Sequence, residues 1–472
     1  MDSLFRKKIF SVQSKIMNSR TEHWIELDKQ YLWHPFTPMS VWLAGEPVII
    51  ERGEGFYLMD TEGRRYIDGI SSLWCNVHGH RVPEIDQAIR DQLEQIAHST
   101  LLGLGQTRSI ELAEKLVQIA PKGLCKVFYS DSGATAVEIA LKMAYQYWQN
   151  LGCKERTHFI AVQEAYHGDT IGSVSVGGME LFHGIFKSLL FETYFVPSPH
   201  PYRFEGTPQQ CAEFSLENLE FLLRRHPGQI AGIILEPLVQ GAAGMLVHPP
   251  GFLTEVRRLA DRYDVLLIAD EVATGFGRTG RMFACEHEQV CPDLMCLAKG
   301  ITGGYLPLAA TLTTQKIFDA FLGRPEEFKT FFHGHTYTGN ALACAAALAS
   351  LQLFEKHQVL ERMPPKIDAI RAALGRIQDL PYVGDVRQCG LMAGIELVCD
   401  KKTKEPFAYR HTLGAKVCAA MRPKGAMMRP LGNVIVLMPA PAMDLPTLQT
   451  LLDIVEETIR NDVPKIVRGL EP

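Results

Sequence analysis

Cys296-Leu297-Ala298-Lys299-Gly300-Ile301-Thr302-Gly303-Gly304 carries one lysine directly after a short apolar run, and glycines follow it. A second apolar run, Val265-Leu266-Leu267-Ile268-Ala269, lies upstream and ends in Asp270-Glu271-Val272. Short apolar runs with polar or glycine residues at their ends predict buried strands. The sequence therefore places an amine and a carboxylate at the ends of two buried strands.

This pair of residues is what a pyridoxal phosphate enzyme requires. The Lys299 amine would form a Schiff base with the cofactor, and Asp270 would keep the pyridine nitrogen protonated so that the ring accepts electrons. Either residue alone means little, because most lysines are solvated surface groups. The prediction gains weight from the motifs around the pair.

The overall composition is that of an ordinary globular protein. The chain has 472 residues, 46% hydrophobic and 21% charged, and is long enough for more than one core. A formal net charge of −5 at pH 7 implies no polybasic surface, which argues against a nucleic-acid partner. The eleven cysteines are scattered without disulfide spacing, as expected of free thiols in a reducing cytoplasm.

Targeting and membrane segments are not evident in the sequence. The small-residue stretch from Ala341 to Leu351 is too short to span a membrane and predicts a buried helix. Residues 1–20 lack the apolar core of a signal peptide, so we expect a flexible extension, with Met17 as an alternative start. A transit peptide is a weaker alternative because Asp2 is acidic and arginine is not enriched. We expect a cytoplasmic protein without a membrane contact.

Apolar runs alternate with helical stretches from about residue 105 to 340. Apolar residues at i, i+3, i+4, i+7 spacing predict helices at 137–144 and 252–263. Strands are predicted at 126–129, 159–162, 232–235 and 265–269. Strands that are apolar throughout and separated by helices indicate a mostly parallel sheet covered on both faces. The fold class is therefore α/β.

The two ends of the chain differ from this central part. Residues 48–60 followed by Thr61-Glu62-Gly63 predict a β-hairpin and a turn, and strands at 392–397 and 434–438 alternate with helices. We predict four parts: the extension at 1–20, the N-terminal part of a small domain at 21–75, a large cofactor-binding domain at 76–345, and the C-terminal α+β part of the small domain at 346–472.

A candidate phosphate site is Ser130-Asp131-Ser132-Gly133-Ala134, between a predicted strand and a predicted helix. Small residues there allow backbone N–H groups and the Ser132 hydroxyl to approach a phosphate at the helix N-terminus. The same residues also make an ordinary helix N-cap. Together with Lys299 and Asp270, they favour a phosphate site.

Three further segments carry side chains suited to a cofactor or substrate. Tyr166, in the string 163–169, follows a strand and can stack on a flat ring, with Asp169 placed to orient a neighbouring histidine; the alternative is a core tyrosine. The polar string His333 to Asn340 offers a threonine hydroxyl to a phosphate, or a cap for the next helix. Arg429 suits a planar carboxylate, although a surface salt bridge is the usual fate of an arginine.

Two motifs indicate less than they first suggest. Gly275-Phe276-Gly277-Arg278-Thr279-Gly280 matches a dinucleotide pattern, but no helix opens there, so we interpret it as a glycine-rich active-site loop and reject nicotinamide binding. The cluster Cys285, His287, Cys291 and Cys296 fits no common zinc spacing, so no metal is predicted.

Together these strings resemble the class III aminotransferases. The motifs that carry the resemblance are Ser132-Gly133-Ala134, Tyr166-His167-Gly168, Glu236-Pro237, Asp270-Glu271-Val272 with segment 275–280, and Lys299-Gly300. The resemblance spans nearly all of the chain after residue 20. It implies the type I (aspartate aminotransferase-like) pyridoxal phosphate fold, with a mostly parallel central sheet covered by helices and a smaller α+β domain. It also implies pyridoxal 5'-phosphate as the cofactor and a homodimer.

Within this class, the segments 31–39, 77–80 and 428–432 resemble the biotin-synthesis members, closest to the Bacillus type. The resemblance implies transfer of an amino group to 8-amino-7-oxononanoate, giving 7,8-diaminononanoate, with S-adenosylmethionine or lysine as donor. The alternatives are another ω-aminotransferase acting on ornithine, 4-aminobutyrate or a diamine, a decarboxylase or aminomutase on the same fold, and a non-catalytic cofactor-binding regulator.

The resemblance further implies roles for single residues. Lys299 would bind the cofactor and move the proton, and Asp270 would pair with the ring nitrogen. Tyr166 would cover the substrate side of the ring and Val272 the opposite face. The residues implied in holding the phosphate end are Ser132, Gly133 and Ala134, with His335 nearby and Thr336 from the other subunit.

The implied substrate-binding residues complete the set. Arg429 would bind the carboxylate of the keto acid, and Gly334 would contribute backbone. The other residues implied at the substrate are Trp33, Phe36, Leu73 and Trp74. Many family members have Trp-Trp where this chain has Leu73-Trp74, and Tyr where it has Phe36, so the donor stays open and leans toward lysine.

Overall fold

The computed structural model describes residues 19–470. Ser19 and Arg20 already belong to the first helix, α1 (Ser19–Tyr31), whereas the rest of the predicted extension lies outside the described residues. Over residues 19–470, no helix combines the length and the apolar character that a membrane span needs.

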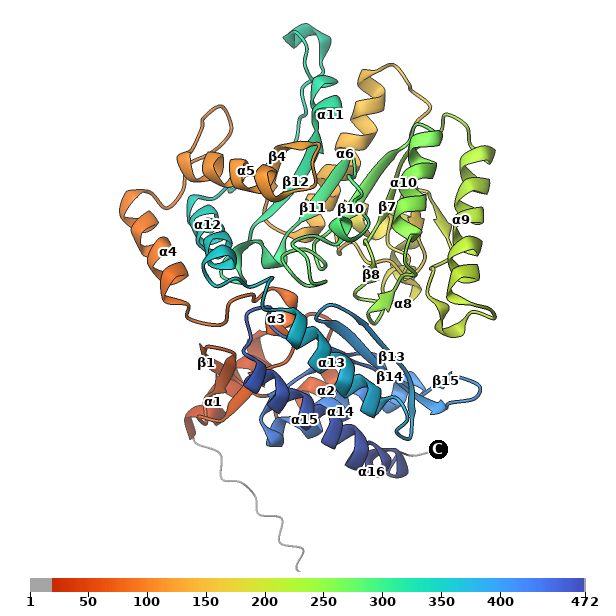
Figure 1. Ribbon diagram of the computed structural model, residues 1–472. Helices are drawn as coiled ribbons and strands as arrows, with labels where there is room; N and C mark the ends of the chain where they lie inside the picture. The colour runs from red at the N-terminus through yellow and green to blue at the C-terminus, as the bar shows by residue number, and fades with distance from the viewer. Residues whose placement is uncertain (1–18, 471–472) are drawn as a thin grey trace, which may run out of the picture.

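A seven-stranded sheet forms the centre of the upper part of the molecule in Figure 1. Its strands run in the order β4-β12-β11-β10-β7-β5-β6. All are parallel except β12, which is antiparallel to both of its neighbours. The bounds are β4 Leu124–Ser130, β5 His158–Val162, β6 Thr193–Val196, β7 Ile230–Leu235, β10 Leu266–Asp270, β11 Leu294–Leu297 and β12 Ala309–Thr314. The expected mostly parallel sheet is confirmed.

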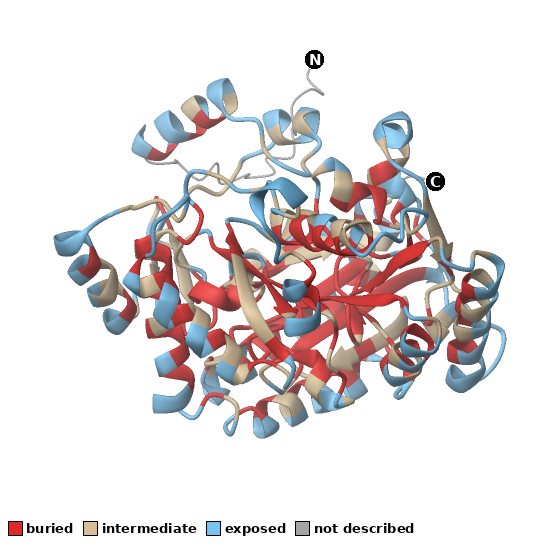
Figure 2. Ribbon diagram, turned by 90° about the horizontal axis from the view of Figure 1, so that it is seen from above, coloured by how far each residue is buried: buried red, intermediate tan, exposed pale blue. Residues whose placement is uncertain are grey.

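The sheet is parallel because its strands are apolar on both faces and helices connect them. Along β10, Leu266 and Ile268 pack with helix α6 (Gly133–Asn150), whereas Leu267 and Ala269 pack with α10 (Phe252–Arg262) on the other face. This alternation is the two-residue period of a strand. Figure 2 shows the buried strands enclosed between helices whose outer faces are exposed.

Two smaller sheets lie below the large one in Figure 1, where N-terminal and C-terminal segments meet. The first has the order β1-β2-β3-β16, and its last pair joins Arg65–Asp68 in parallel to Ala426–Met427. The second has the order β13-β14-β18-β17, with β15 beside β14. The bounds are β1 Ile50–Glu54, β2 Tyr57–Asp60, β3 Arg65–Asp68, β13 Val383–Cys389, β14 Met392–Asp400, β15 Glu405–Pro406, β16 Ala426–Met427, β17 Arg429–Leu431 and β18 Val434–Leu437. The domain boundaries at 75 and 345 stay a prediction.

The remaining elements surround these sheets. Among them, α13 and α15 pack on the second small sheet through one shared apolar cluster. Their bounds are α2 Met39–Ala44, α3 Ser71–Trp74, α4 Pro83–Gln95, α5 Thr107–Ile119, α7 Ile171–Ser175, α8 Glu180–His183, α9 Pro208–Arg225, α11 Gln315–Asp319, α12 Ala341–Lys356, α13 Pro364–Ile377, α14 Leu413–Met421, α15 Leu445–Asn461 and α16 Val463–Arg468, with the short pair β8 Val239–Gln240 and β9 Leu246–Val247.

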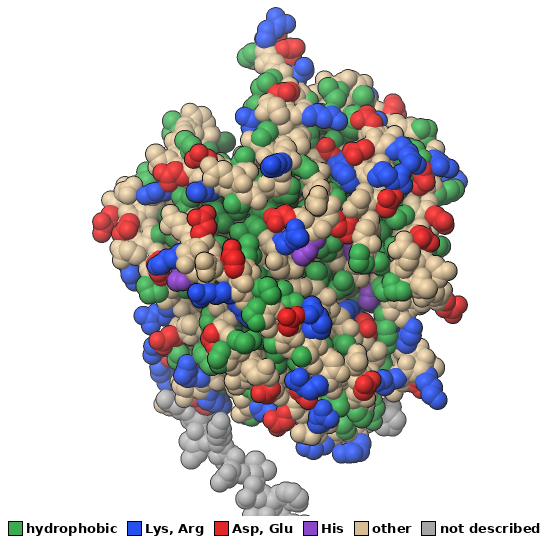
Figure 3. Space-filling model, viewed as in Figure 1, with side chains coloured by type: hydrophobic (Ala, Val, Ile, Leu, Met, Phe, Trp, Pro, Cys, Tyr) green, Lys and Arg blue, Asp and Glu red, His purple; other side chains and the backbone are tan. Residues whose placement is uncertain are grey.

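The direction of the parallel strands determines where a site can form. Strands β4, β5, β7, β10 and β11 all end at the same edge of the large sheet. Ligands of open α/β sheets bind at this carboxyl edge. On the face shown in Figure 3, acidic and basic side chains are interspersed, consistent with the small net charge.

Candidate active site

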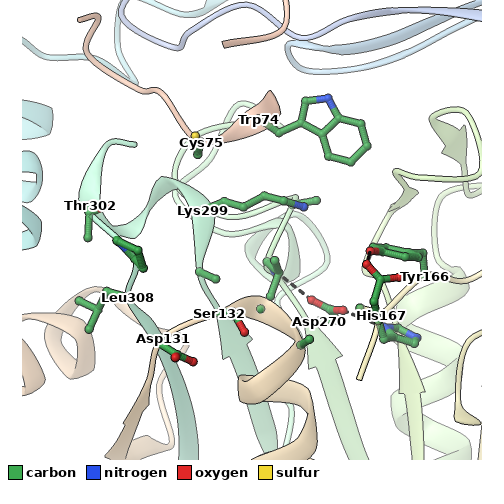
Figure 4. A pocket seen from close by; sticks show the side chains of 18 of the residues that line it. Trp74, Cys75, Asp131, Ser132, Tyr166, His167, Asp270, Lys299, Thr302 and Leu308 are labelled. Carbon is green, nitrogen blue, oxygen red and sulfur yellow. Dashed lines mark hydrogen bonds and ion pairs between the residues drawn. The ribbon is translucent and has the colours of Figure 1, made fainter. Parts of the chain in front are cut away.

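A cavity of about 710 Å³ opens at the carboxyl edge of the large sheet. Figure 4 shows that its side chains come from several strand ends and converge on one space. Eight of the residues expected at the site line this cavity: Trp74, Ser132, Gly133, Ala134, Tyr166, Asp270, Val272 and Lys299.

Lys299 is the second residue after β11 and begins a short 3-10 turn, Lys299–Thr302. Its side chain is enclosed, and burial lowers the pKa of its amine, an effect opposed by the nearby Asp270 and Glu236 carboxylates. The amine lies 4.8 Å from the centre of the Trp74 ring. Within the described residues it makes no hydrogen bond or ion pair, so it is available to react.

Asp270 ends β10 and faces His167 across the sheet. The His167 Nδ1 and Asp270 Oδ2 atoms are 2.7 Å apart, and both side chains are buried. The other oxygen of Asp270 accepts a hydrogen bond from the Val272 backbone N–H at 3.0 Å. The carboxylate is therefore fixed in orientation by two neighbours.

The histidine partner differs from the expected one. Asp169, which we expected to orient a histidine, accepts a hydrogen bond from the Tyr166 hydroxyl at 2.7 Å. Asp270 holds His167 instead. The reason is that β5 and β10 end at the same edge of the sheet, although their ends are far apart in sequence.

The N-terminus of α6 faces the same cavity. Ser132 caps the helix by accepting from the Thr135 N–H at 3.3 Å, and Gly133 is the first helical residue. The first N–H groups of a helix have no carbonyl partner inside it, and the helix dipole favours an anion there. A Cβ on Gly133 would lie 2.6 Å from the Val272 side chain, so only glycine leaves this approach open.

Trp74 reaches the cavity from a strained turn. The four residues of α3 are non-glycine residues with left-handed φ angles of 41°, 43°, 64° and 73°. A left-handed conformation costs about 1–2 kcal/mol per residue. Asp68 offsets this cost by accepting from the Ser72 N–H at 2.9 Å and the Ser72 hydroxyl at 2.8 Å. The Ser71 hydroxyl donates to the carbonyl of Met438 at 2.8 Å.

These residues fit pyridoxal phosphate. The unpaired amine of Lys299, the open N-terminus of α6 and the aromatic rings of Trp74 and Tyr166 meet in one cavity. The Trp74 indole N–H and the second ring nitrogen of His167 are buried without a partner in residues 19–470. An amine, an anion site and a fixed acid are the groups that this cofactor uses.

Seven expected site residues do not line the cavity in the single chain. Trp33 is 89% exposed and Leu73 is 40% exposed. Phe36, at a φ of 49°, contacts Phe182, which in turn contacts Tyr166. The remaining four are Gly334 and Thr336, which are exposed, and His335 and Arg429, which are half-buried. Their roles stay predictions.

Sequence reasoning missed some of the lining residues and misplaced one loop. His167 and Glu236 line the cavity, and both stand inside quoted motifs without an assigned role. Segment 275–280 does not line it. Its Arg278 is buried and donates to the carbonyls of Pro439 and Asn76, both at 2.9 Å, so it joins distant segments instead. Over the described part of the chain, no group of metal-ligand side chains converges.

Comparisons with known proteins point to one family. A family model described as aminotransferase class-III matches residues 40–459. The chain is 53% identical over 435 residues to the adenosylmethionine-8-amino-7-oxononanoate aminotransferase of Geobacter sulfurreducens, covering 92% of this chain and 96% of that one.

Two solved structures extend the comparison. The enzyme of that name from Methanocaldococcus jannaschii superposes with a TM-score of 0.89 at 50% identity, covering 93% of this chain and 98% of the other. The ω-transaminase of Pseudomonas jessenii in complex with PMP superposes with a TM-score of 0.89 at 31% identity, covering 94% and 99%.

Proposed function

The chain belongs to the class III aminotransferases, and from this premise we propose that it transfers an amino group to 8-amino-7-oxononanoate, giving 7,8-diaminononanoate in biotin synthesis. It is a pyridoxal phosphate-dependent transaminase. The observation that carries the substrate proposal is the 53% identity, over 92% of the chain, to an enzyme named for this keto acid. Resemblance of the segments 31–39, 77–80 and 428–432 to the biotin-synthesis members points the same way.

The cofactor supplies an electron-accepting ring, and residues of the chain direct its chemistry. Burial lowers the pKa of the Lys299 amine, which favours its reactive neutral form, and this amine would bind the carbonyl of the cofactor and then carry a proton. Asp270, fixed by His167, would pair with the ring nitrogen of the cofactor and keep that nitrogen protonated. Trp74 and Tyr166 line the same cavity as Lys299 and would exclude water from the reacting groups.

The proposed reaction is a two-step exchange. A donor amine leaves its nitrogen at the site and departs as a carbonyl compound, and the keto acid then collects the nitrogen. Arg429 suits the distal carboxylate of that acid because a guanidinium binds a carboxylate through two parallel hydrogen bonds. Trp33, Phe36, Leu73 and Trp74 are the residues that we assign to the donor side. The donor is S-adenosylmethionine or lysine.

A homodimer and a cytoplasmic location belong to the proposal. Gly334 and Thr336 are exposed in the single chain, and exposed apolar side chains neighbour them in space or sequence, including Leu102 and Phe332. Apolar exposure of this kind marks a protein–protein surface. A second copy would cover it and bring Thr336 to the phosphate. The eleven cysteines are all free thiols, which suits a reducing compartment.

The test is a half-reaction with purified holoenzyme. The enzyme is mixed separately with S-adenosylmethionine, lysine, ornithine and 4-aminobutyrate, and the cofactor absorbance is followed from the lysine-bound to the aminated form. The aminated enzyme is then offered 8-amino-7-oxononanoate. We expect one of the first two donors to convert the band, and the keto acid to restore it. Conversion by ornithine or 4-aminobutyrate only, with no response to the keto acid, would contradict the proposal in favour of another ω-aminotransferase.

A further inference from the structure

Glu236 is a buried carboxylic acid in the active-site cavity that the reaction above does not use. It follows directly after β7, is 4% exposed and lines the cavity with Lys299 and Asp270. A buried acid without a bound metal or a salt bridge is costly unless its oxygens are hydrogen-bonded. The partners of this acid therefore indicate its role.

Both oxygens of Glu236 accept hydrogen bonds from backbone N–H groups. Oε1 accepts from Tyr166 at 3.1 Å, and Oε2 accepts from Gly241 at 2.8 Å. A carboxylate can accept at both ends, whereas a glutamine amide presents an NH2 group at one end. A glutamine at this position would place its NH2 group against the backbone N–H of Tyr166 or of Gly241, and that backbone would have to move.

The two donors belong to different segments of the chain beside the cavity. Tyr166 lies in the segment after β5 and presents its ring to the site, with its hydroxyl held by Asp169. Gly241 lies under Trp74, because a Cβ on it would be 3.4 Å from that ring. Glu236 thus links the backbone of Gly241, which lies under the Trp74 ring, to the backbone of Tyr166, whose own ring lines the cavity.

We propose that Glu236 is a positioning residue for amino transfer: its two hydrogen bonds hold the backbones beside the Tyr166 and Trp74 rings in place around Lys299, and its ionised form adds a negative charge to the cavity that Lys299 shares. The inference rests on the proposed transaminase chemistry at this cavity, and it is independent of which amine is the donor. Neither the motifs of the sequence nor the named relatives assign a role to this residue.

The charge of Glu236 is sensitive to its surroundings. Burial raises its pKa to about 7, with Asp270 adding to this rise and His167 and the two backbone N–H groups opposing it. Burial lowers the pKa of the Lys299 amine most and the charge of Arg278 adds to this, whereas the charges of Asp270, Glu236 and Cys75 raise it. Removal of the Glu236 charge destabilises the ammonium form, so the pKa of Lys299 must fall further.

A matched control lies thirty-five positions later in the chain. Glu271 is 0% exposed and also accepts from two backbone N–H groups, those of Ala284 at 3.0 Å and Cys285 at 2.8 Å. It does not line the cavity. Glu271 also accepts from the Thr274 hydroxyl at 2.6 Å. Glu271→Gln therefore reproduces the loss of a buried carboxylate that accepts from two backbone N–H groups, at a position outside the cavity.

The experiment compares wild type, Glu236→Gln, Glu236→Asp and Glu271→Gln with two readouts. The first is the pH midpoint of Lys299 acylation in the apoenzyme, measured by peptide mass spectrometry. We expect Glu236→Gln to lower this midpoint by about one pH unit. Glu236→Asp keeps the charge, so its midpoint stays, as does that of Glu271→Gln.

The second readout is the donor half-reaction of the holoenzyme. We expect Glu236→Gln and Glu236→Asp each to slow it by about tenfold or more, since small displacements of a site are expensive in rate. Equal midpoints and equal rates in Glu236→Gln and Glu271→Gln would overturn the inference. If wild type converts no amine donor at all, the proposed function fails instead. Should Glu236→Gln not fold, Glu236→Asp decides through its rate.

Discussion

The floor and the rim of the cavity are built differently. The floor residues Lys299, Asp270 and His167 lie at strand ends of one sheet, and hydrogen bonds or burial fix them within a single chain. Trp33, Leu73 and Thr336, which we predict to form the rim, lie outside the sheet and are exposed in the single chain. The difference teaches that the floor is complete within a single chain, whereas the predicted rim residues are not brought to the cavity by that chain alone.

The largest effect is expected from breaking the floor. Lys299→Ala removes the attacking amine and the proton carrier together, so we expect amino transfer to fall by about 10⁴-fold or more. Overall transaminase turnover measures this loss. Lys356→Ala is the control, because that lysine forms a surface ion pair with Glu84. A Lys299→Ala protein that still carried a borohydride-trappable cofactor would refute the assignment.

At the rim, a single side chain is expected to change donor choice. Leu73→Trp adds an aromatic face beside Trp74, which favours a sulfonium cation over a plain ammonium donor through cation–π contact. We expect the ratio of kcat/KM for S-adenosylmethionine to that for lysine to rise by about tenfold. Leu93→Trp, at an exposed leucine of α4, serves as the control. An unchanged ratio would remove Leu73 from the donor wall.

A smaller effect tests whether the rim is shared between two chains. If Thr336 donates to the phosphate as proposed, Thr336→Ala loses that hydrogen bond, and we expect cofactor affinity to weaken by about three- to tenfold. Equilibrium dialysis of the apoenzyme measures the affinity.

Mixing the variants makes this test decisive. In hybrids of Lys299→Ala and Thr336→Ala chains, one site would contain both wild-type residues if Thr336 acts across the dimer. Such hybrids should bind cofactor at one site with wild-type affinity. If Thr336 acts within its own chain, every functional site stays weakened.

Much of the floor could be predicted from the sequence because its signals are local. Lys299 and Asp270 directly follow or end apolar runs, and Ser132-Gly133-Ala134 stands between a strand and a helix. The parallel sheet followed from the same runs. The pairing of His167 with Asp270 did not, because the residues lie on segments that only the sheet order brings together.

Other features lacked a sequence signal altogether. The glycine pattern at 275–280 predicted an active-site loop. Instead, the buried Arg278 in this segment donates hydrogen bonds to the carbonyls of Pro439 and Asn76. Ser71-Ser72-Leu73-Trp74 contains no glycine, so nothing in it predicts four left-handed residues. That conformation depends on acceptors supplied by Asp68 and by Met438, and the latter lies at the far end of the chain.

This turn has a consequence for the order of synthesis. The Trp74 wall depends on Ser71 bonding to the carbonyl of Met438, which leaves the ribosome hundreds of residues after the turn itself. Lys299 and Asp270 are synthesised well before that point. A nascent chain therefore contains the reactive Lys299 before Trp74 can be held over it. The covered site is completed only when nearly all of the protein has been made.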